Sequence, residues 1–271
     1  MAFKTAALLL LAFSAAASAG EKVLTHPFWG LAPSTETVTS RLPGLVKGET
    51  LEYDIYWGVV LVGHSFISVP DAVLIDSRPA WHIVSEAHSG SFINNFYRVD
   101  DRNEAWMDAA DLYSYGYYKR VSEGKFFTNE WAVFDWAAKR YYGEKMNRKR
   151  QVSAFEGPLE KPVNDIFSAV YRLRAMTVAP GSKVEMDVNS RKNWRLAIKA
   201  GKREKIKTGY GKKQCILLEP MAGEEGLFVA KAGRRMLVWI TDDELKLPMM
   251  LRAEIFIGSV TAKLVRRTIK Q

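Results

Sequence analysis

The sequence predicts a mainly β protein: a single large curved antiparallel sheet, a half-barrel or barrel-like cup, with one main α-helix. Three observations predict this class. Apolar and polar residues alternate along most of the chain after residue 48, which is the period of half-buried strands. Turn residues separate these segments at short intervals, as in an antiparallel meander. Helical spacing occurs in one segment, residues 163–177. Such a sheet must bury one face, so it is expected to curl around the helix.

Composition sets the outer limits on function. The chain has 271 residues, of which 48% are hydrophobic and 25% charged, which is globular rather than disordered composition. A chain of this length buries a core without covalent staples. One cysteine, Cys215, excludes an intramolecular disulfide framework and a cysteine-rich zinc module. The formal charge of +9 favours anionic partners or surfaces.

The first nineteen residues have the form of a secretory signal. Lys4 precedes an apolar run over residues 6–13, and Ala17-Ser18-Ala19 is a small-residue cleavage site before Gly20. The sequence therefore predicts cleavage between Ala19 and Gly20 and a periplasmic or secreted protein. An uncleaved anchor is the alternative. No later stretch reaches the roughly 18 apolar residues of a membrane helix, so no transmembrane segment is expected after cleavage.

Three regions follow from this: a signal peptide over 1–19, an extended lead-in over 20–47, and a β-rich domain over 48–271. The lead-in is rich in proline, and its Phe28-Trp29 pair is expected to pack back onto the domain. Two lobes split near the helix are the alternative to one domain.

The first strands of the domain are predicted around Tyr53 and Trp57, which alternate with polar or small residues, and over residues 61–69. The register of this hairpin stays open. A two-residue turn at Gly58-Val59 places His64 beside Tyr53, whereas a three-residue turn places Ser65 there, and the two choices exchange the faces of the second strand. At the other end of the chain, a turn at Gly258-Ser259 is expected to pair Ile257 with Val260.

The helix is predicted over 163–177, after Pro162 and before Pro180-Gly181. Asn164 or Asp165 is expected to accept hydrogen bonds from its first amides. Phe167, Val170 and Tyr171 form its apolar stripe. Arg174 follows the stripe at helical spacing, which predicts a buried guanidinium paired with Asp100, Asp101 or Asp242; an exposed arginine at the helix end is the alternative.

Motifs of known enzymes are absent from the sequence, and no catalytic residue is assigned. His82, Glu86 and His88 share one strand face, but the two histidines are six residues apart, about 20 Å, so one metal ion cannot bridge them. Adjacent acids at Asp242-Asp243 point to opposite sides of a strand and are expected to belong to a turn. No metal site and no cofactor are predicted.

Basic residues concentrate in one stretch. Residues 191–213 contain ten lysines or arginines and one acid, Glu204. Arg191, Arg195 and Lys199 are expected to share the outer face of one strand, either as a solvated exterior or as a surface for anionic envelope lipid. Export argues against nucleic acid as a partner.

Aromatic residues crowd positions 113–142, mostly as expected core, and some could line an apolar cup. The residues predicted to contact an amphipathic ligand are Tyr53, Trp57, Trp131, Arg191, Arg195 and Lys199.

Several short motifs, in order, resemble an exported bacterial family, domain of unknown function 3108. They are Gly48-Glu49-x-Leu51-x-Tyr53 with Trp57 and Gly63, Tyr97 to Arg102, Asp165-x-x-Ser168-x-x-Tyr171-x-Leu173-Arg174, Trp239-Ile240-x-Asp242-Asp243 with Leu247-Pro248, and Gly258-Ser259-Val260-x-Ala262-x-Leu264. The resemblance implies an exported β-rich domain and no established activity. It marks Asp165, Tyr171, Arg174, Asp242 and Asp243 as structural motif residues. A likeness to the half-barrel carriers of periplasmic lipoproteins and lipids rests on fold analogy.

Three functions remain in competition. The first is a non-catalytic envelope protein whose cup binds an amphipathic or lipid-like ligand, and the sequence favours it. The second is an interaction or assembly factor that uses the sheet as a docking surface. The third is a metal-dependent hydrolase using His82, Glu86 or the Asp242 acids.

Overall fold

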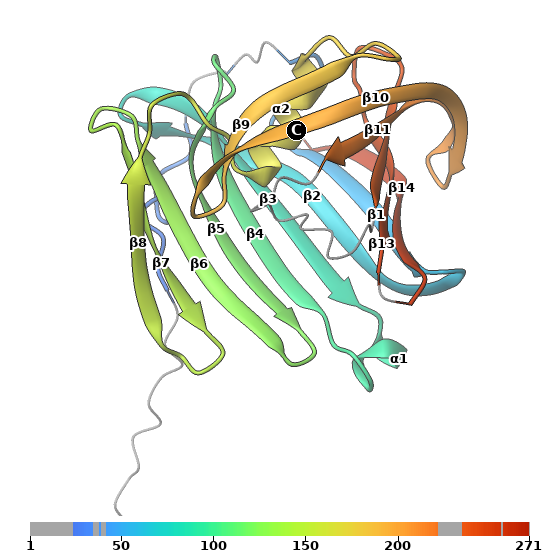
Figure 1. The fold of residues 1–271 in the computed structure, drawn as a ribbon, viewed down its shortest axis with the longest axis horizontal. Coiled ribbons are helices and arrows are strands. Elements are labelled where there is room, and N and C mark those ends of the chain that lie inside the picture. The colour runs from blue at the N-terminus through green and yellow to red at the C-terminus, as the bar shows by residue number, and fades with distance from the viewer. Residues whose placement is uncertain (1–23, 35–37, 39–41, 222–234, 256, 271) are drawn as a thin grey trace, which may run out of the picture.

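The computed structural model describes residues 24–34, 38, 42–221, 235–255 and 257–270. In these residues, fourteen antiparallel strands form one open, curved sheet, and a helix lies inside the curve (Figure 1). The predicted fold class is confirmed.

The strands follow the chain in two runs. Their bounds are β1 Glu49–Trp57, β2 Val60–Ile75, β3 Arg78–Ser89, β4 Asp100–Asp108, β5 Ser114–Glu123, β6 Phe126–Asp135, β7 Arg140–Asn147, β8 Val152–Pro158, β9 Lys183–Asn189, β10 Asn193–Thr208, β11 Gly211–Met221, β12 Met236–Thr241, β13 Pro248–Glu254 and β14 Ser259–Ile269. The described helices are α1, Ser91–Asn94, and α2, Ile166–Ala175.

The topology explains the cup. Strands β1 to β8 form a meander on one side of the sheet, β9 to β14 form a second meander, and β1 pairs with β14 to join them. The chain crosses from edge strand β8 to edge strand β9 through α2. Just before α2, the backbone of Asn164 exchanges hydrogen bonds with Asp187 and Asn189 of β9, and its side chain donates to Leu112 O at 2.7 Å. This short segment ties the two distant arms together over the concave face.

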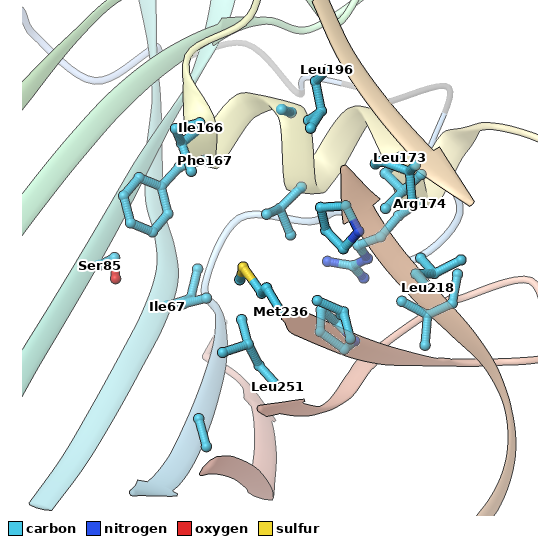
Figure 2. A pocket seen from close by; sticks show the side chains of 18 of the residues that line it. Ile67, Ser85, Ile166, Phe167, Leu173, Arg174, Leu196, Leu218, Met236 and Leu251 are labelled. Atoms are coloured by element: carbon cyan, nitrogen blue, oxygen red, sulfur yellow. The ribbon is translucent and has the colours of Figure 1, made fainter. Parts of the chain in front are cut away.

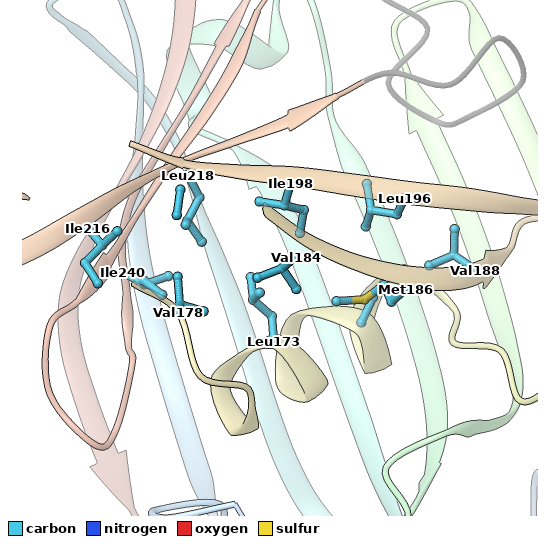
Figure 3. Close-up of a cluster of buried hydrophobic side chains, with 12 residues drawn as sticks. Leu173, Val178, Val184, Met186, Val188, Leu196, Ile198, Ile216, Leu218 and Ile240 are labelled. Atoms are coloured by element: carbon cyan, nitrogen blue, oxygen red, sulfur yellow. The ribbon is translucent and has the colours of Figure 1, made fainter. Parts of the chain in front are cut away.

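The concave face holds α2 between the two arms. Tyr171 packs against Trp81, Ile83 and Met107 of β3 and β4. On its other side, Leu173 packs against the strands β9 to β11 (Figure 3). The helix is therefore buried from both sides because its apolar residues cover more than one face.

The convex face over β3 to β7 is covered by the lead-in. Leu24 and His26 are buried there, and Phe28 and Trp29 pack on the cluster around Trp106. The predicted return of Phe28-Trp29 to the domain is confirmed. The predicted signal peptide and its cleavage site lie outside the described residues.

The first hairpin combines both predicted registers. Trp57 pairs with Val60 around the two-residue turn, but a bulge beyond Tyr56 shifts the register so that Tyr53 lies opposite Ser65. The bulge inserts Val62 beside Gly63, which approaches the backbone of His88 too closely for a Cβ atom. Ser65 and Ile67 therefore share the concave face with Tyr53.

Two other predictions require correction. The last hairpin pairs Glu254 with Ser259, so the proposed pairing of Ile257 with Val260 is wrong; Ile255 bonds back to Gly258 O, and Gly258 has a φ of 79°. A single positive φ fits a longer loop better than a two-residue type I′ turn. The helix begins at Ile166 rather than residue 163, because residues 163 and 164 hydrogen-bond to β5 and β9 instead.

Candidate ligand-binding site

The start of α2 is fixed by Asp165, as predicted. Its Oδ1 accepts hydrogen bonds from Phe167 N at 2.8 Å and Ser168 N at 3.2 Å. Its Oδ2 accepts from the Ser168 hydroxyl and from Ser114 Oγ of β5 at 2.7 Å. Burial raises the pKa of Asp165, and these hydrogen bonds oppose that effect. The cap thus also anchors the helix to the sheet.

The far end of α2 is fixed by a buried ion pair. Arg174 Nη1 lies 3.0 Å from Glu49 Oε2, and its Nη2 lies 3.2 Å from Glu49 Oε1, with side-chain exposures of 1% and 0%. Arg267 Nε adds a third contact to Glu49 at 2.9 Å, and Arg174 Nε donates to Leu245 O. The predicted burial of Arg174 is confirmed.

The predicted partners of Arg174 are wrong. Asp100 pairs with Arg120, Asp101 accepts from Ser122 N, and Asp242 pairs with Arg203, all away from α2. The partner is Glu49, at the start of β1. A carboxylate separated from the arginine by 125 residues gives no signal in local spacing.

Between these two anchors lies an apolar cavity of about 270 Å³. Figure 2 shows Phe167 and Arg174 entering it from α2, facing Met236 and Leu251. Its lining comprises Tyr53, Ser65, Ile67, Ser85, Ile166, Phe167, Ala169, Val170, Leu173, Arg174, Leu196, Ile198, Leu218, Pro220, Met236, Val238, Ile240, Pro248, Leu251 and Ala262. The set contains no histidine, cysteine or carboxylate. Chemically, the site can hold an apolar group, and it offers no evident nucleophile–base pair.

The sequence-predicted ligand residues do not gather at this cavity. Tyr53 lines it, with its hydroxyl donating to Pro248 O at 3.0 Å, and burial raises the pKa of this phenol. Trp57 is half exposed at the hairpin tip and donates to Ile257 O. Trp131 lies on the convex face beside His26. The expectation that the aromatic strands line the cup therefore holds only in part, because their side chains alternate between both faces.

The three basic candidates also separate. Arg195 pairs with Glu185 and Asp187 on the outward face of β10, where Lys199 is exposed. Arg191 does not share that face: it lies in the β9–β10 turn with a φ of 76°, and its Nε is 3.5 Å from Glu130 Oε2. The acids of Asp242-Asp243 are structural, as expected.

Asp243 accepts hydrogen bonds from Thr241 Oγ1 and from the backbone amides of Leu245 and Lys246, which shapes the turn before β13.

Comparison with known proteins identifies the family. Residues 52–265 match the family described as "Protein of unknown function (DUF3108)". The chain belongs to the DUF3108 family. No curated protein matches this DUF3108 chain.

Two solved structures resemble the DUF3108 fold. A β-barrel-like protein of the domain of unknown function DUF1849 from Brucella abortus has a TM-score of 0.53 and 10% identity, over 86% of this chain and 100% of that chain. This likeness concerns the fold alone. A "putative lipoprotein" from Parabacteroides distasonis has a TM-score of 0.31 and 8% identity over the same shares, which is too weak to support an argument.

The histidine constellation lies on the convex face of the DUF3108 sheet. His82 Nε2 is 2.7 Å from Glu104 Oε2, Glu86 pairs with Arg102, and His88 ND1, the Nδ1 atom, is 3.4 Å from Asp100. Each side chain thus has its own partner on β4. In the described ranges there is no group of three or more potential ligands able to hold a metal ion. Within the same ranges, no helix is long and apolar enough to cross a membrane.

Proposed function

We propose that this DUF3108 protein is an exported, non-catalytic envelope protein that binds the apolar chain of an amphipathic, lipid-like ligand in its concave cavity. The observation that carries the proposal is the apolar space between α2 and the two arms of the sheet. Export is supported by the form of residues 1–19, with the periplasm as the expected compartment.

The energetics of the cavity favour an apolar occupant. Each methylene transferred from water contributes about 0.8 kcal/mol. An unfilled apolar space also loses dispersion contacts on all its walls, which a chain would restore. The cavity volume of about 270 Å³ lies just below the usual range for small-molecule sites and suits part of an acyl chain.

The chemistry of the lining supports binding over catalysis. Its polar groups are Tyr53, Arg174 and two serines, Ser65 and Ser85. Arg174 is already paired with Glu49, and the lining provides no general base next to a serine. A hydrolase would need such a pair, or a metal ion with protein ligands.

The test fills the cavity with a side chain. Leu251 of β13 lies between Val238 and Ala262, which both line the cavity, so Leu251→Trp places an indole where the chain would lie. The control is Leu74→Trp, the same substitution at an exposed position of β2. Binding is measured by displacement of a fluorescent fatty-acid probe from the purified mature protein, with a thermal melt for each variant.

Wild type and Leu74→Trp are expected to bind fatty acid alike, and Leu251→Trp to bind at least tenfold more weakly while still melting cooperatively. Native mass spectrometry of detergent-free wild type should show an associated lipid mass. Equal binding by both variants, or no binding by wild type, overturns the proposal. In the second case the docking-surface function would be preferred.

A further inference from the structure

A second cavity, of about 250 Å³, lies on the same concave face. It is bounded by β4 to β6, the start of α2 and the β9–β10 turn. Ile166 and Phe167 line both cavities, so the two are neighbours on either side of these side chains. Unlike the first cavity, the second has charged walls, with Lys119 of β5 and Glu130 of β6.

One line of directly paired residues crosses the floor of both cavities. From β2 to β7 it comprises Ile67, Ser85, Asn103, Lys119, Glu130 and Lys145. Ile67 and Ser85 line the apolar cavity, whereas Asn103, Lys119 and Glu130 line the polar one. Since neighbouring strands are about 4.8 Å apart, the line extends for roughly 24 Å from an apolar end to a charged end.

The charged end carries more cations than anions. Glu130 is 3% exposed, accepts a hydrogen bond from Tyr117 Oη at 3.3 Å, and has Arg191 Nε at 3.5 Å. Among the residues that the structure describes, neither Lys119 nor Lys145 forms an ion pair. Burial, followed by the nearby charge of Arg191, lowers the pKa of Lys145. Three basic side chains thus surround one buried carboxylate that already has Arg191 as its partner.

We propose that this polar cavity binds the anionic headgroup of the ligand, such as a phosphate or carboxylate, through Lys119 and Lys145, while the tail lies in the apolar cavity. The inference rests on the proposed function and names the ligand class as an anionic amphiphile. An anion here would receive charge-assisted hydrogen bonds from two ammonium groups that lack ion-pair partners. Its tail would leave past Ile166 and Phe167.

The probes are two lysophospholipids with the same twelve-carbon chain. Lysophosphatidylglycerol has a net negative head, and lysophosphatidylcholine has a neutral zwitterionic one. Calorimetric titration of the mature wild-type protein at low salt compares them. The variants are Lys119→Gln and Lys145→Gln, and the matched control is Lys199→Gln on the outward face of β10. A thermal melt accompanies each variant.

We expect wild type to prefer the anionic lipid, each cavity lysine variant to lose about fivefold in affinity for it, and the control to lose nothing. Affinity for the zwitterionic lipid should stay unchanged in all four proteins. If a lysine variant fails to fold, the salt dependence of wild type supplies the test, because screening should weaken binding of the anionic lipid alone. Equal binding of both lipids, unaltered by salt or by the variants, overturns the headgroup site while leaving the apolar cavity intact. Binding of neither lipid overturns the proposed function itself.

Discussion

The two faces of the sheet are covered in different ways. On the convex face, the lead-in inserts His26 against Trp106, with ring centroids 4.3 Å apart and planes 15° apart. His82 stacks against Trp106 as well, at 5.1 Å. Phe28 contacts the edge of the same indole, and Trp29 donates to Glu104 at 3.3 Å. The convex cover therefore fills its face with interlocked aromatic rings.

On the concave face, α2 is held at both ends and leaves space between them. Asp165 fixes one end and Arg174 the other, while Phe167 and Val170 border cavities. The comparison separates two roles of apolar residues. Where a cover fits its face closely, the residues stabilise the sheet; where a rigidly anchored cover stands off, they form a binding site. The predictions below test this contrast by stability and by ligand binding.

The largest effect is expected at Trp106, the centre of the convex cluster. Its side chain is 1% exposed. Trp106→Ala should reduce the free energy of unfolding by about 3–5 kcal/mol, because it empties a closely packed aromatic site. Urea unfolding measures the change. Trp57→Ala, at a tryptophan that is 49% exposed, is the control and should cost less than about 1 kcal/mol. Similar losses in both variants would show that the convex cover does not stabilise the sheet.

The lead-in should also make stability depend on pH. Burial lowers the pKa of His26 to about 4, since its Nε2 donates to Ala132 O and its Nδ1 accepts from Phe28 N in the neutral form. The unfolded chain binds this proton near pH 6.5. The contribution is therefore complete above about pH 6.5 and is lost as the pH falls toward 4, by on the order of 3 kcal/mol.

The measurement is the difference in unfolding free energy between wild type and His26→Phe at several pH values from 7 to 4. This difference isolates His26 from other groups, such as Glu123, whose pKa is raised to about 7 by burial and by Asp101 and which acts in the opposite direction. His64→Phe, at a histidine with a 52% exposed side chain, is the matched control. A difference that does not vary with pH would place His26 in contact with solvent in the folded protein.

Much of this fold is predictable because local patterns decide it. Alternation reveals most strands, and Asp165 marks the helix start through its capping chemistry. The first hairpin shows the limit. The turn residues predict Trp57 opposite Val60, but only the bulge at Val62 puts Ser65 and Ile67 on the cavity side. Gly63 within a strand was the available signal for that bulge.

The site is less predictable because its parts meet across the sheet. Glu49 and Arg174 come together only when β1 and α2 are placed in one fold. Lys119 and Lys145 are neighbours of Glu130 only through the registers of two hairpins. Charge density in the sequence pointed instead to residues 191–213, of which Arg191 alone was found to contact this cluster through Glu130. Pair distances set by register, rather than local charge, decide which cations share a cavity.

The smallest stability effect is expected at Phe167, on the concave face. The stripe position alone predicts a loss of about 3–5 kcal/mol for Phe167→Ala, the range for a filled core site. The structure lowers this expectation to about 1–2 kcal/mol, because the half-buried ring borders two cavities and makes fewer contacts to lose. Phe134→Ala, at a ring that is 2% exposed on the same face, is the matched control and should show the full loss. Fatty-acid binding should respond in the opposite order, with a larger change in Phe167→Ala than in Phe134→Ala. Urea unfolding and probe displacement on both variants measure the two orders, and a Phe167 variant as unstable as the Phe134 variant would mean that the concave face is packed as closely as the convex one.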